Sequence, residues 1–275
     1  MGKTIVRNIC SGRARIGRPV GPVFVSQRQP SRLLPQEGHL AGRFNFVQAQ
    51  FLAAYTKFKI DCQTVQRLGD DGDGGKFICT SIIQPNKCIL YSIGSRKDFS
   101  FEIDVVKKLG CTVHTFDCTV GEVKPEEVPT GVTFHPWCIG ANNGNSVFHS
   151  DLSNKTENEI GRYVSIQTAM TLLNHSHVDV LKMDIERHEF KVIDSLKCPN
   201  CIGQLAIEIH LHNAYNMWKR PVSQREWNTL WTQLTDRDGF GVFSYEPNPK
   251  SSCCCEYSLL NRHIYPPARN STIKH

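Results

Sequence analysis

The chain has 275 residues, of which 40% are hydrophobic, and this is enough for one large domain with a buried core. Its net charge of +6 is concentrated in residues 1–43, where eight basic residues and one acid give +7 and leave −1 for the remainder. The nearly neutral remainder gives no indication of a basic nucleic-acid-binding face, and no apolar run reaches the ~18 residues of a membrane span.

Residues 1–43 are rich in Arg, Gly, Pro and Ser and have neither helical nor strand periodicity. They predict a disordered basic leader ahead of a domain over 44–275. An Arg-rich, acid-poor leader fits mitochondrial targeting. Sequons at Asn154, Asn174 and Asn270 are equally compatible with the secretory pathway, so the compartment stays open.

Helical and strand patterns alternate along the rest of the chain. In chain order we expect a helix over 44–58, a loop and short strand over 67–79, a strand over 88–94, a helix over 98–110, strands over 111–117 and 132–140, a helix over 159–175, strands over 178–184 and 203–211, a helix over 225–239, and a final strand pair over 240–247 and 256–263. This order predicts an α/β fold with a doubly wound, mostly parallel sheet and one antiparallel strand at an edge. Ligands of such sheets bind beyond the carboxyl ends of the strands.

The segment LYSIGSRKDFSFE (90–102) reads as strand, tight turn and helix. Gly94 would let the backbone approach a ligand, and Asp117, at the end of the next strand, could bind both hydroxyls of a ribose. An ordinary turn and a solvated aspartate are the alternative. Because Gly94 is followed by Ser, Arg and Lys, the G-x-G-x-x-G pattern for pyrophosphate is missing, which disfavours NAD or FAD and favours S-adenosylmethionine.

Acidic residues and a histidine follow two later strands. Asp184 ends the strand over 178–184, where it could orient the amino group of a sulfonium cofactor or accept a substrate proton. Glu186 could bind substrate, and we expect Glu189 to cap or pair on the next helix. Glu208 and His210 end the following strand, and His210 is a candidate general base. A metal site of Asp184, Glu208 and His210 and a histidine bonded to backbone are alternatives; we expect no metal.

Twelve cysteines are a high count for a chain of this length. We expect five of them to be single buried thiols in strands: Cys79, Cys88, Cys111, Cys118 and Cys138. The CxxC pair Cys198 and Cys201 could bind zinc together with the triplet over 253–255. No second CxxC or HxxxH spacing completes such a set, so we do not expect zinc.

The loop RLGDDGDGGKFIC (67–79) combines acids with glycines. It lacks the closing glutamate of an EF-hand, so a calcium loop is not expected. A lid over the cofactor and a solvated loop remain as interpretations.

Three of these segments, LYSIGSRKDFSFE, VHTFDCT and LKMDIERHEF, resemble in order and spacing the methyltransferase domain of the methyltransferase-like protein 24 group, which is related to FkbM-type methyltransferases. The loop over 67–79 looks like the R-x-G-x-x-x-DGG segment of that group. The resemblance covers roughly residues 60–262. It implies a class I, Rossmann-like fold of seven strands that uses S-adenosylmethionine.

The resemblance also implies cofactor contacts, namely Ser92, Gly94 and Ser95 at the methionine end, Asp117 at the ribose, and Cys138 and Ile139 beside the adenine. Two departures stand out: a second glycine is absent from the first motif, and Arg187 replaces the glycine of D-x-E-G-x-E. A residue other than glycine strains a turn that needs positive φ.

We therefore predict a methyltransferase that acts on an oxygen or nitrogen acceptor of unknown identity, with Asp184, Glu186 and His210 as its catalytic residues. FkbM-type relatives favour hydroxyl acceptors. The non-enzyme alternative is an inactive fold kept as a binding or scaffold module, which Arg187 makes credible. A short-chain oxidoreductase is disfavoured because no Tyr-x-x-x-Lys lies around residues 155–175. The sequence gives no oligomeric state.

Overall fold

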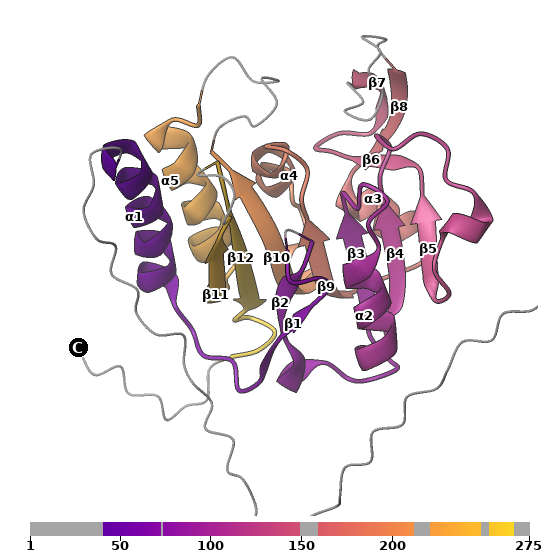
Figure 1. The fold of residues 1–275 in the computed structure, drawn as a ribbon, viewed down its shortest axis with the longest axis horizontal. Coiled ribbons are helices and arrows are strands. Elements are labelled where there is room, and N and C mark those ends of the chain that lie inside the picture. The colour runs from indigo at the N-terminus through magenta and orange to yellow at the C-terminus, as the bar shows by residue number, and fades with distance from the viewer. Residues whose placement is uncertain (1–40, 73, 149–158, 212–220, 249–252, 267–275) are drawn as a thin grey trace, which may run out of the picture. The chain divides into compact units, whose positions relative to one another are not determined.

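A computed structural model describes residues 41–72, 74–148, 159–211, 221–248 and 253–266 (Figure 1). The predicted leader lies outside these residues apart from its last three, which begin the first helix. The helices are α1 (Ala41–Phe58), α2 (Ser100–Leu109), α3 (Ile166–Leu172), α4 (Glu189–Asp194) and α5 (Gln224–Thr232), with short 3-10 or π turns at Thr80–Ile82, Pro125–Glu127, Pro199–Cys201 and Gln233–Arg237. The strands are β1 (Val65–Leu68), β2 (Lys76–Cys79), β3 (Ile89–Ile93), β4 (Thr112–Phe116), β5 (Val132–His135), β6 (Trp137–Ile139), β7 (Gly144–Phe148), β8 (Glu159–Val164), β9 (Val178–Met183), β10 (Ile202–His210), β11 (Phe240–Pro247) and β12 (Cys254–Asn261).

Seven strands form the central sheet in the order β11-β12-β10-β9-β3-β4-β5 (Figure 1). Strands β5, β4, β3, β9 and β10 run parallel, whereas β12 is antiparallel to both β10 and β11. The predicted antiparallel strand is thus β12, paired with the edge strand β11. This arrangement confirms the predicted doubly wound fold and brings the carboxyl ends of five strands to one edge of the sheet.

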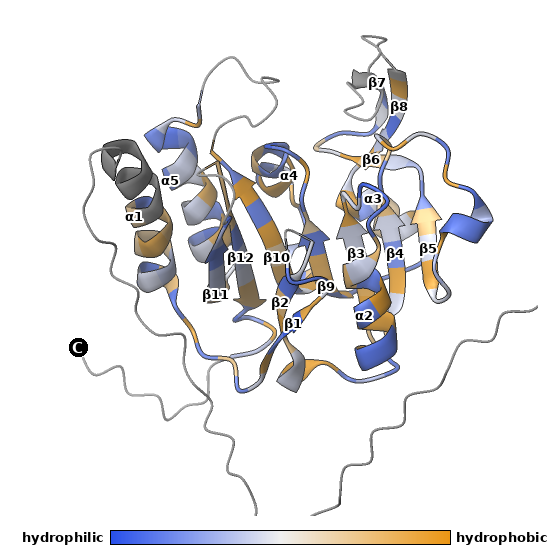
Figure 2. Ribbon diagram, viewed as in Figure 1, coloured by the Kyte–Doolittle hydropathy of each residue, from blue (hydrophilic) through white to orange (hydrophobic). Residues whose placement is uncertain are grey.

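Two layers bury the sheet. One core cluster packs α1, α3, α4 and α5 on one face, and the other packs α2 and the β1–β2 hairpin on the opposite face. Leu90 and Val180 face α2, while their neighbours Tyr91 and Leu181 join the other layer. Hydrophobic residues run along β9 and β10 at the centre (Figure 2). Strands buried on both faces in this way are typical of parallel sheets, and they hold the strand ends rigidly.

The helix predicted over 159–175 is wrong in its first part. Residues 159–164 form β8, which pairs with β6 and β7 in a separate three-stranded sheet beyond the carboxyl ends of β3 to β5 (Figure 1). The helix begins only after Ser165, whose Oγ accepts a hydrogen bond from Thr168 N at 3.2 Å. The strand predicted over 132–140 is likewise divided into β5 and β6 at Pro136, which has no N–H for a ladder.

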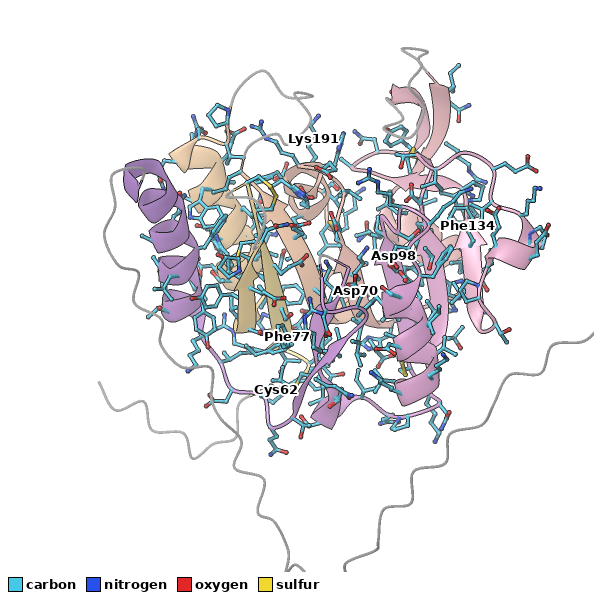
Figure 3. The ribbon with its side chains drawn as sticks, in the orientation of Figure 1. Cys62, Asp70, Phe77, Asp98, Phe134 and Lys191 are labelled. Atoms are coloured by element: carbon cyan, nitrogen blue, oxygen red, sulfur yellow. A yellow bond between two sulfur atoms is a disulfide. The ribbon has the colours of Figure 1, made fainter. Side chains whose placement is uncertain are left out.

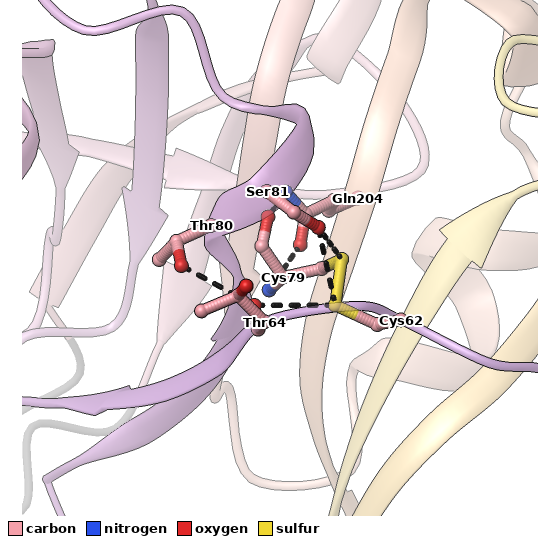
Figure 4. Close-up of a disulfide and its surroundings, with 6 residues drawn as sticks. All are labelled: Cys62, Thr64, Cys79, Thr80, Ser81 and Gln204. Carbon is pink, nitrogen blue, oxygen red and sulfur yellow. Dashed lines mark hydrogen bonds between the residues drawn. A yellow bond between two sulfur atoms is a disulfide. The ribbon is translucent and has the colours of Figure 1, made fainter.

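The five cysteines expected to be single thiols are all in disulfides. Cys88 pairs with Cys111 and Cys118 with Cys138, with Cα atoms 4.6 and 4.9 Å apart. Cys79 pairs with Cys62 ahead of β1 (Figure 4). Bonds also join Cys198 to Cys201 and Cys253 to Cys254, so four of the five cysteines considered for zinc are in disulfides, and Cys255 is a buried free thiol.

Figure 4 also shows how β2 is fixed to the sheet. Cys79 N donates to Gln204 Oε1 at 2.9 Å, and Gln204 Nε2 donates to Cys79 O at 3.0 Å. Gln204 belongs to β10, so the β1–β2 hairpin that precedes the central sheet is bonded to an inner strand of that sheet.

Across the described residues, no helix combines the length and apolar character that a bilayer crossing needs.

Candidate active site

The ends of β3, β4 and β9 meet at one point of the sheet. Gly94 N donates to Phe116 O at 3.0 Å, and Asp184 N donates to Ile93 O at 3.0 Å. The carboxylate of Asp117 reaches across from β4, and its Oδ2 accepts from Arg96 N at 2.8 Å. Three residues singled out from the sequence, Gly94, Asp117 and Asp184, are therefore neighbours at the edge where ligands of this fold class bind.

Gly94 forms a cradle that only glycine can provide. Its φ is +78°, and a Cβ at this position would lie 1.8 Å from the carbonyl oxygen of Asp184. The next residue, Ser95, is 5% exposed, and its Oγ has no hydrogen-bond partner among the described residues. A buried hydroxyl without a partner costs about 1–3 kcal/mol, so a ligand that bonds to it gains affinity. These features fit the methionine end of S-adenosylmethionine.

Asp117 is held by its own loop. Its Oδ1 accepts from the N–H and the hydroxyl of Thr119, at 2.9 and 2.7 Å. Together with Arg96 N this makes three donors, whereas an ionised carboxylate offers about four acceptor positions. The Cys118–Cys138 disulfide joins the residue after Asp117 to β6, so Cys138 and Ile139 are both held buried near this strand end.

Ser92 lies one residue before the end of β3 and is completely buried. Its hydroxyl donates to Glu102 of α2. Burial raises the pKa of Glu102, and Lys182 and the Ser92 hydroxyl only partly offset this. The Ser92 side chain is thus committed to the α2 interface in this structure.

Asp184 is flanked by cationic side chains that the sequence argument missed. Lys76, in β2, is 1% exposed and pairs with Glu256 of β12, and its Nζ lies 3.9 Å from Asp184 Oδ2. Burial alone would raise the pKa of Asp184, but Lys76, Lys182 and His210 outweigh it and lower this pKa. Asp184 is therefore a carboxylate at neutral pH, as its predicted roles require.

His210 is surrounded by carboxyl groups. Its Nδ1 donates to Glu189 Oε1 at 2.9 Å, so it is bonded to a carboxylate rather than to backbone. Its Nε2 lies 3.5 Å from oxygens of Glu186 and Glu208 and 3.9 Å from Asp184 Oδ1. Burial would lower the pKa of His210, but Glu189, Asp184 and Glu208 raise it well above its usual value.

The pKa values of the neighbouring acids Glu208 and Glu256 are also shifted. Burial, together with the charges of Asp184 and Glu256, raises the pKa of Glu208 to about 9. Burial raises the pKa of Glu256 to about 7, even though Lys76 opposes it. At neutral pH Glu208 therefore holds a proton, while Asp184 does not. This difference makes Asp184 the better proton acceptor of the two.

The turn after β9 contains two residues with left-handed backbone. Glu186 has φ of 52° and Arg187 has φ of 78°. Arg187 thus adopts the conformation that suits the glycine of D-x-E-G-x-E, at a cost of about 1–2 kcal/mol. Glu189, the first residue of α4, accepts from Ile185 N at 3.1 Å and from His210 Nδ1, so it pairs rather than caps, and His188 at the N-cap makes no side-chain capping bond.

The described residues of the acidic loop, 69–72, 74 and 75, lie beside α2, where Gly69 N donates to Asp104 Oδ2 at 3.0 Å, and Asp70 and Asp98 are close together in Figure 3. Arg67 donates to the carbonyls of Asp70 and Gly72, and Asp70 Oδ1 accepts from Gly74 N at 3.1 Å. A Cβ on Gly74 would come 3.1 Å from Asp98 Oδ2. The loop therefore contacts the turn that follows Gly94, as a lid would require.

Lys76 and Glu256 were missed because each looks ordinary in sequence. The one available signal was a charged residue within a short apolar strand, in KFIC and in CCEYSLL.

A hollow of about 460 Å³, lined in part by Lys87, Asp179 and Tyr265, lies at the opposite, amino end of the strands. The residues that line it include none of the site residues at the carboxyl ends of the strands.

Comparison of the sequence with known proteins indicates the family of this domain. A family model described as a methyltransferase domain matches residues 28–261. The probable methyltransferase-like protein 24 of Homo sapiens is 30% identical over 185 residues, which cover 65% of this chain and 48% of that protein. Its counterpart from Rattus norvegicus is 29% identical over 134 residues, which cover 47% of this chain and 35% of that protein. Among solved structures, that of WbdD matches 82% of this chain and 40% of its own, with a TM-score of 0.39 and 12% identity.

The chain belongs to this family of methyltransferase domains. The predicted resemblance to the methyltransferase-like protein 24 group is confirmed, while the relation to FkbM-type enzymes stays a prediction. The family also confirms the methyltransferase class and, with it, S-adenosylmethionine as the cofactor. The chain spans about half the length of the human relative and about a third of the rat protein.

Proposed function

We propose that this domain transfers the methyl group of S-adenosylmethionine to an oxygen or nitrogen of an acceptor, with the cofactor held at the ends of β3, β4 and β9. The observation that carries the proposal is the junction of Gly94, Asp117 and Asp184, which is fixed by backbone hydrogen bonds between neighbouring strands. The unpartnered Ser95 hydroxyl beside this junction supports it.

The roles of the residues follow from their positions. Gly94 and Ser95 receive the methionine end of the cofactor, Asp117 receives the ribose, and Cys138 and Ile139 border the adenine. When bound, S-adenosylmethionine supplies an electrophilic methyl group on a sulfonium. The chain's own task is to align the acceptor with that methyl and to take up the acceptor's proton.

Asp184 is the proposed proton acceptor, because it lies at the end of β9 beside Gly94 and because Lys76, Lys182 and His210 lower its pKa against the effect of burial, so that it is ionised and free to take up a proton. The acceptor's O–H or N–H bond breaks as its oxygen or nitrogen bonds to the methyl carbon, and the proton passes to the Asp184 carboxylate. Glu186, which is partly exposed, is the proposed substrate contact. His210 is less suited to the role of base than the sequence suggests, because its raised pKa keeps it protonated at neutral pH.

A calorimetric titration with S-adenosylmethionine and S-adenosylhomocysteine tests cofactor binding. We expect Asp117→Asn to weaken binding at least tenfold. Asp179→Asn is the matched control, because Asp179 also accepts a strand N–H at 2.8 Å, from Ile89, but at the amino end of the sheet. Equal affinities for the two variants would contradict the proposed ribose contact, and no binding to the wild type would contradict the function.

Turnover on a panel of hydroxyl and amine acceptors separates an enzyme from a binding module. We expect S-adenosylhomocysteine to accumulate with at least one acceptor class and Asp184→Asn to abolish it. Cofactor binding without turnover on any acceptor would favour the scaffold alternative, in which the strained Arg187 turn has replaced an active one.

We also infer that the domain works in an oxidising compartment, which favours secretory-pathway targeting over the mitochondrial matrix. Three disulfides, each closing a loop of about 20 residues, support this. Asn174, in the sequon Asn-His-Ser, is exposed in the turn after α3. Mass spectrometry of the protein from its native cells should find Cys88 linked to Cys111; free thiols at both positions would refute the inference.

A further inference from the structure

We infer that Asp184, Glu186 and His210, with Glu208 beside them, form a binding site for a divalent metal ion of the Mn²⁺ or Zn²⁺ type. Ligand atoms of the first three residues all lie within 4.8 Å of one another. The inference rests on the proposed function, because the ion would lie next to Asp184 at the acceptor side of the cofactor. From the sequence alone we expected no metal, so this inference differs from that expectation.

The spacing around His210 is the first argument. Its Nε2 is 3.5 Å from Glu186 Oε2, 3.5 Å from Glu208 Oε2 and 3.9 Å from Asp184 Oδ1. These separations are too long for good hydrogen bonds. Ligands held ~2.0–2.2 Å from a small divalent ion are separated from one another by about 3.0–3.6 Å. The three oxygens therefore stand around Nε2 at close to the separations of a coordination shell.

The orientation of the imidazole is the second argument. Nδ1 donates to Glu189 Oε1 at 2.9 Å, and Glu189 is completely buried. This bond fixes the ring with Nε2 toward the three carboxyl groups, and a bound ion would displace the proton that Nε2 carries in the metal-free chain. Histidines that bind metals almost always donate their other nitrogen to a carboxylate or carbonyl in this way.

The charge balance is the third argument. Five carboxyl groups, from Asp184, Glu186, Glu189, Glu208 and Glu256, lie around three basic side chains, Lys76, Lys182 and His210. Glu256, 9% exposed, also shares a cluster with Asp184 and Glu208, and its Oε2 is buried without a hydrogen-bond partner in the described part of the chain. With all five carboxyl groups ionised, two negative charges remain, and a divalent cation would balance them in place of the protons that Glu208 and Glu256 hold without it.

The ligand types indicate which ions fit. One imidazole with two or three carboxylates suits Mn²⁺, Fe²⁺ or Zn²⁺ better than Ca²⁺, which takes oxygen ligands alone. A bound ion would attract an acceptor that offers oxygen, because it acts as a Lewis acid and lowers the pKa of a coordinated hydroxyl. The substrate class is thereby narrowed to hydroxyl compounds that can coordinate, such as vicinal diols and hydroxy acids. Asp184 keeps its second oxygen, Oδ2, for the acceptor's proton.

The test is a titration of the full-length, metal-stripped chain with Mn²⁺, in which free Mn²⁺ is followed by electron paramagnetic resonance. We expect one saturable site per chain and at least tenfold weaker binding in Glu186→Gln. Glu186 is the residue to change because its side chain is 34% exposed, so the variant should fold. Glu126→Gln, an exposed acid in the Pro125–Glu127 turn, is the control and should bind like the wild type.

The result that overturns the inference is equally plain. No saturable Mn²⁺ binding, or equal affinity in Glu186→Gln and Glu126→Gln at matched melting temperatures, would refute the metal site. S-adenosylhomocysteine binding is measured on the same samples in EDTA. If the cofactor binds and Mn²⁺ does not, the metal site fails and the methyltransferase proposal stands. If Mn²⁺ binds and the cofactor does not, the metal site stands and the methyltransferase proposal fails.

Discussion

Replacing Gly94 with alanine tests the close contact between β3 and β9 on which the proposed cofactor site depends. The added Cβ would lie 1.8 Å from Asp184 O, whereas real Cβ contacts are essentially never under 3.0 Å. The two strand ends would have to separate by roughly 1.2 Å, a value that follows from these two distances. Such a shift disrupts the bonds from Gly94 N to Phe116 O and from Asp184 N to Ile93 O.

The cost can be worked from these parts. A non-glycine residue in left-handed backbone costs about 1–2 kcal/mol, and each disrupted hydrogen bond about 1 kcal/mol. Together they lower the free energy of unfolding by about 3 kcal/mol. For a domain of this size that corresponds to a melting temperature about 6–12 °C lower.

Gly121 provides the matched control for this variant. Its φ is +68°, but a Cβ there would meet no atom within 4 Å. Gly121→Ala should therefore cost only the backbone strain, about 1 kcal/mol, and should retain S-adenosylhomocysteine binding. Urea unfolding and calorimetry measure both effects. Equal destabilisation by the two substitutions, or cofactor affinity in Gly94→Ala within twofold of wild type, would refute the reasoning.

Three further predictions concern other parts of the domain. Lys76→Met should lower the free energy of unfolding by about 3–5 kcal/mol in urea, because Glu256 is left buried without its cation; a loss below 1 kcal/mol would contradict the pairing. Cys88→Ser should lower the free energy of unfolding by about 2–4 kcal/mol, and dithiothreitol should lower the melting temperature of the wild type by more than that of the variant, which already lacks this disulfide. Burial, with His135 and His175 nearby, lowers the pKa of His114 to about 4, so the unfolded chain binds a proton between pH 6.5 and 4 that the folded chain does not. Stability should fall as the pH is lowered through this window and remain full above it, and the fall should be shallower in His114→Gln.

Much of the fold could be predicted from local pattern. The parallel strands were recognised because a buried strand is a continuous apolar run, and the αL residue Gly110 ends α2 as its position indicated. The segment 159–175 misled because apolar spacing in GRYVSIQTAM suits a helix, whereas pairing with β6 and β7 overrides that preference in β8. Cysteine pairing could not be deduced, since spacing alone does not fix connectivity.

The sequence predicted only those site residues that come directly after a recognisable strand. Gly94, Asp117 and Asp184 each follow a recognisable strand, and strand adjacency brings them together. Lys76 and Glu256 come from a hairpin and from the antiparallel strand, so their contact depends on the complete topology. The pKa of His210 depends on Glu189, Asp184 and Glu208, which come from three different elements, so no local sequence pattern predicts it.

The pairing of Lys76 with Glu256 joins residues separated by 180 positions in the sequence. During synthesis, a nascent chain that has not yet extended past β12 lacks the carboxylate that neutralises Lys76, although β3, β4 and β9 are already available. The charged cluster around Asp184 therefore cannot be completed strand by strand as the polypeptide leaves the ribosome. It must wait for one of the last strands to be made and inserted between β10 and β11.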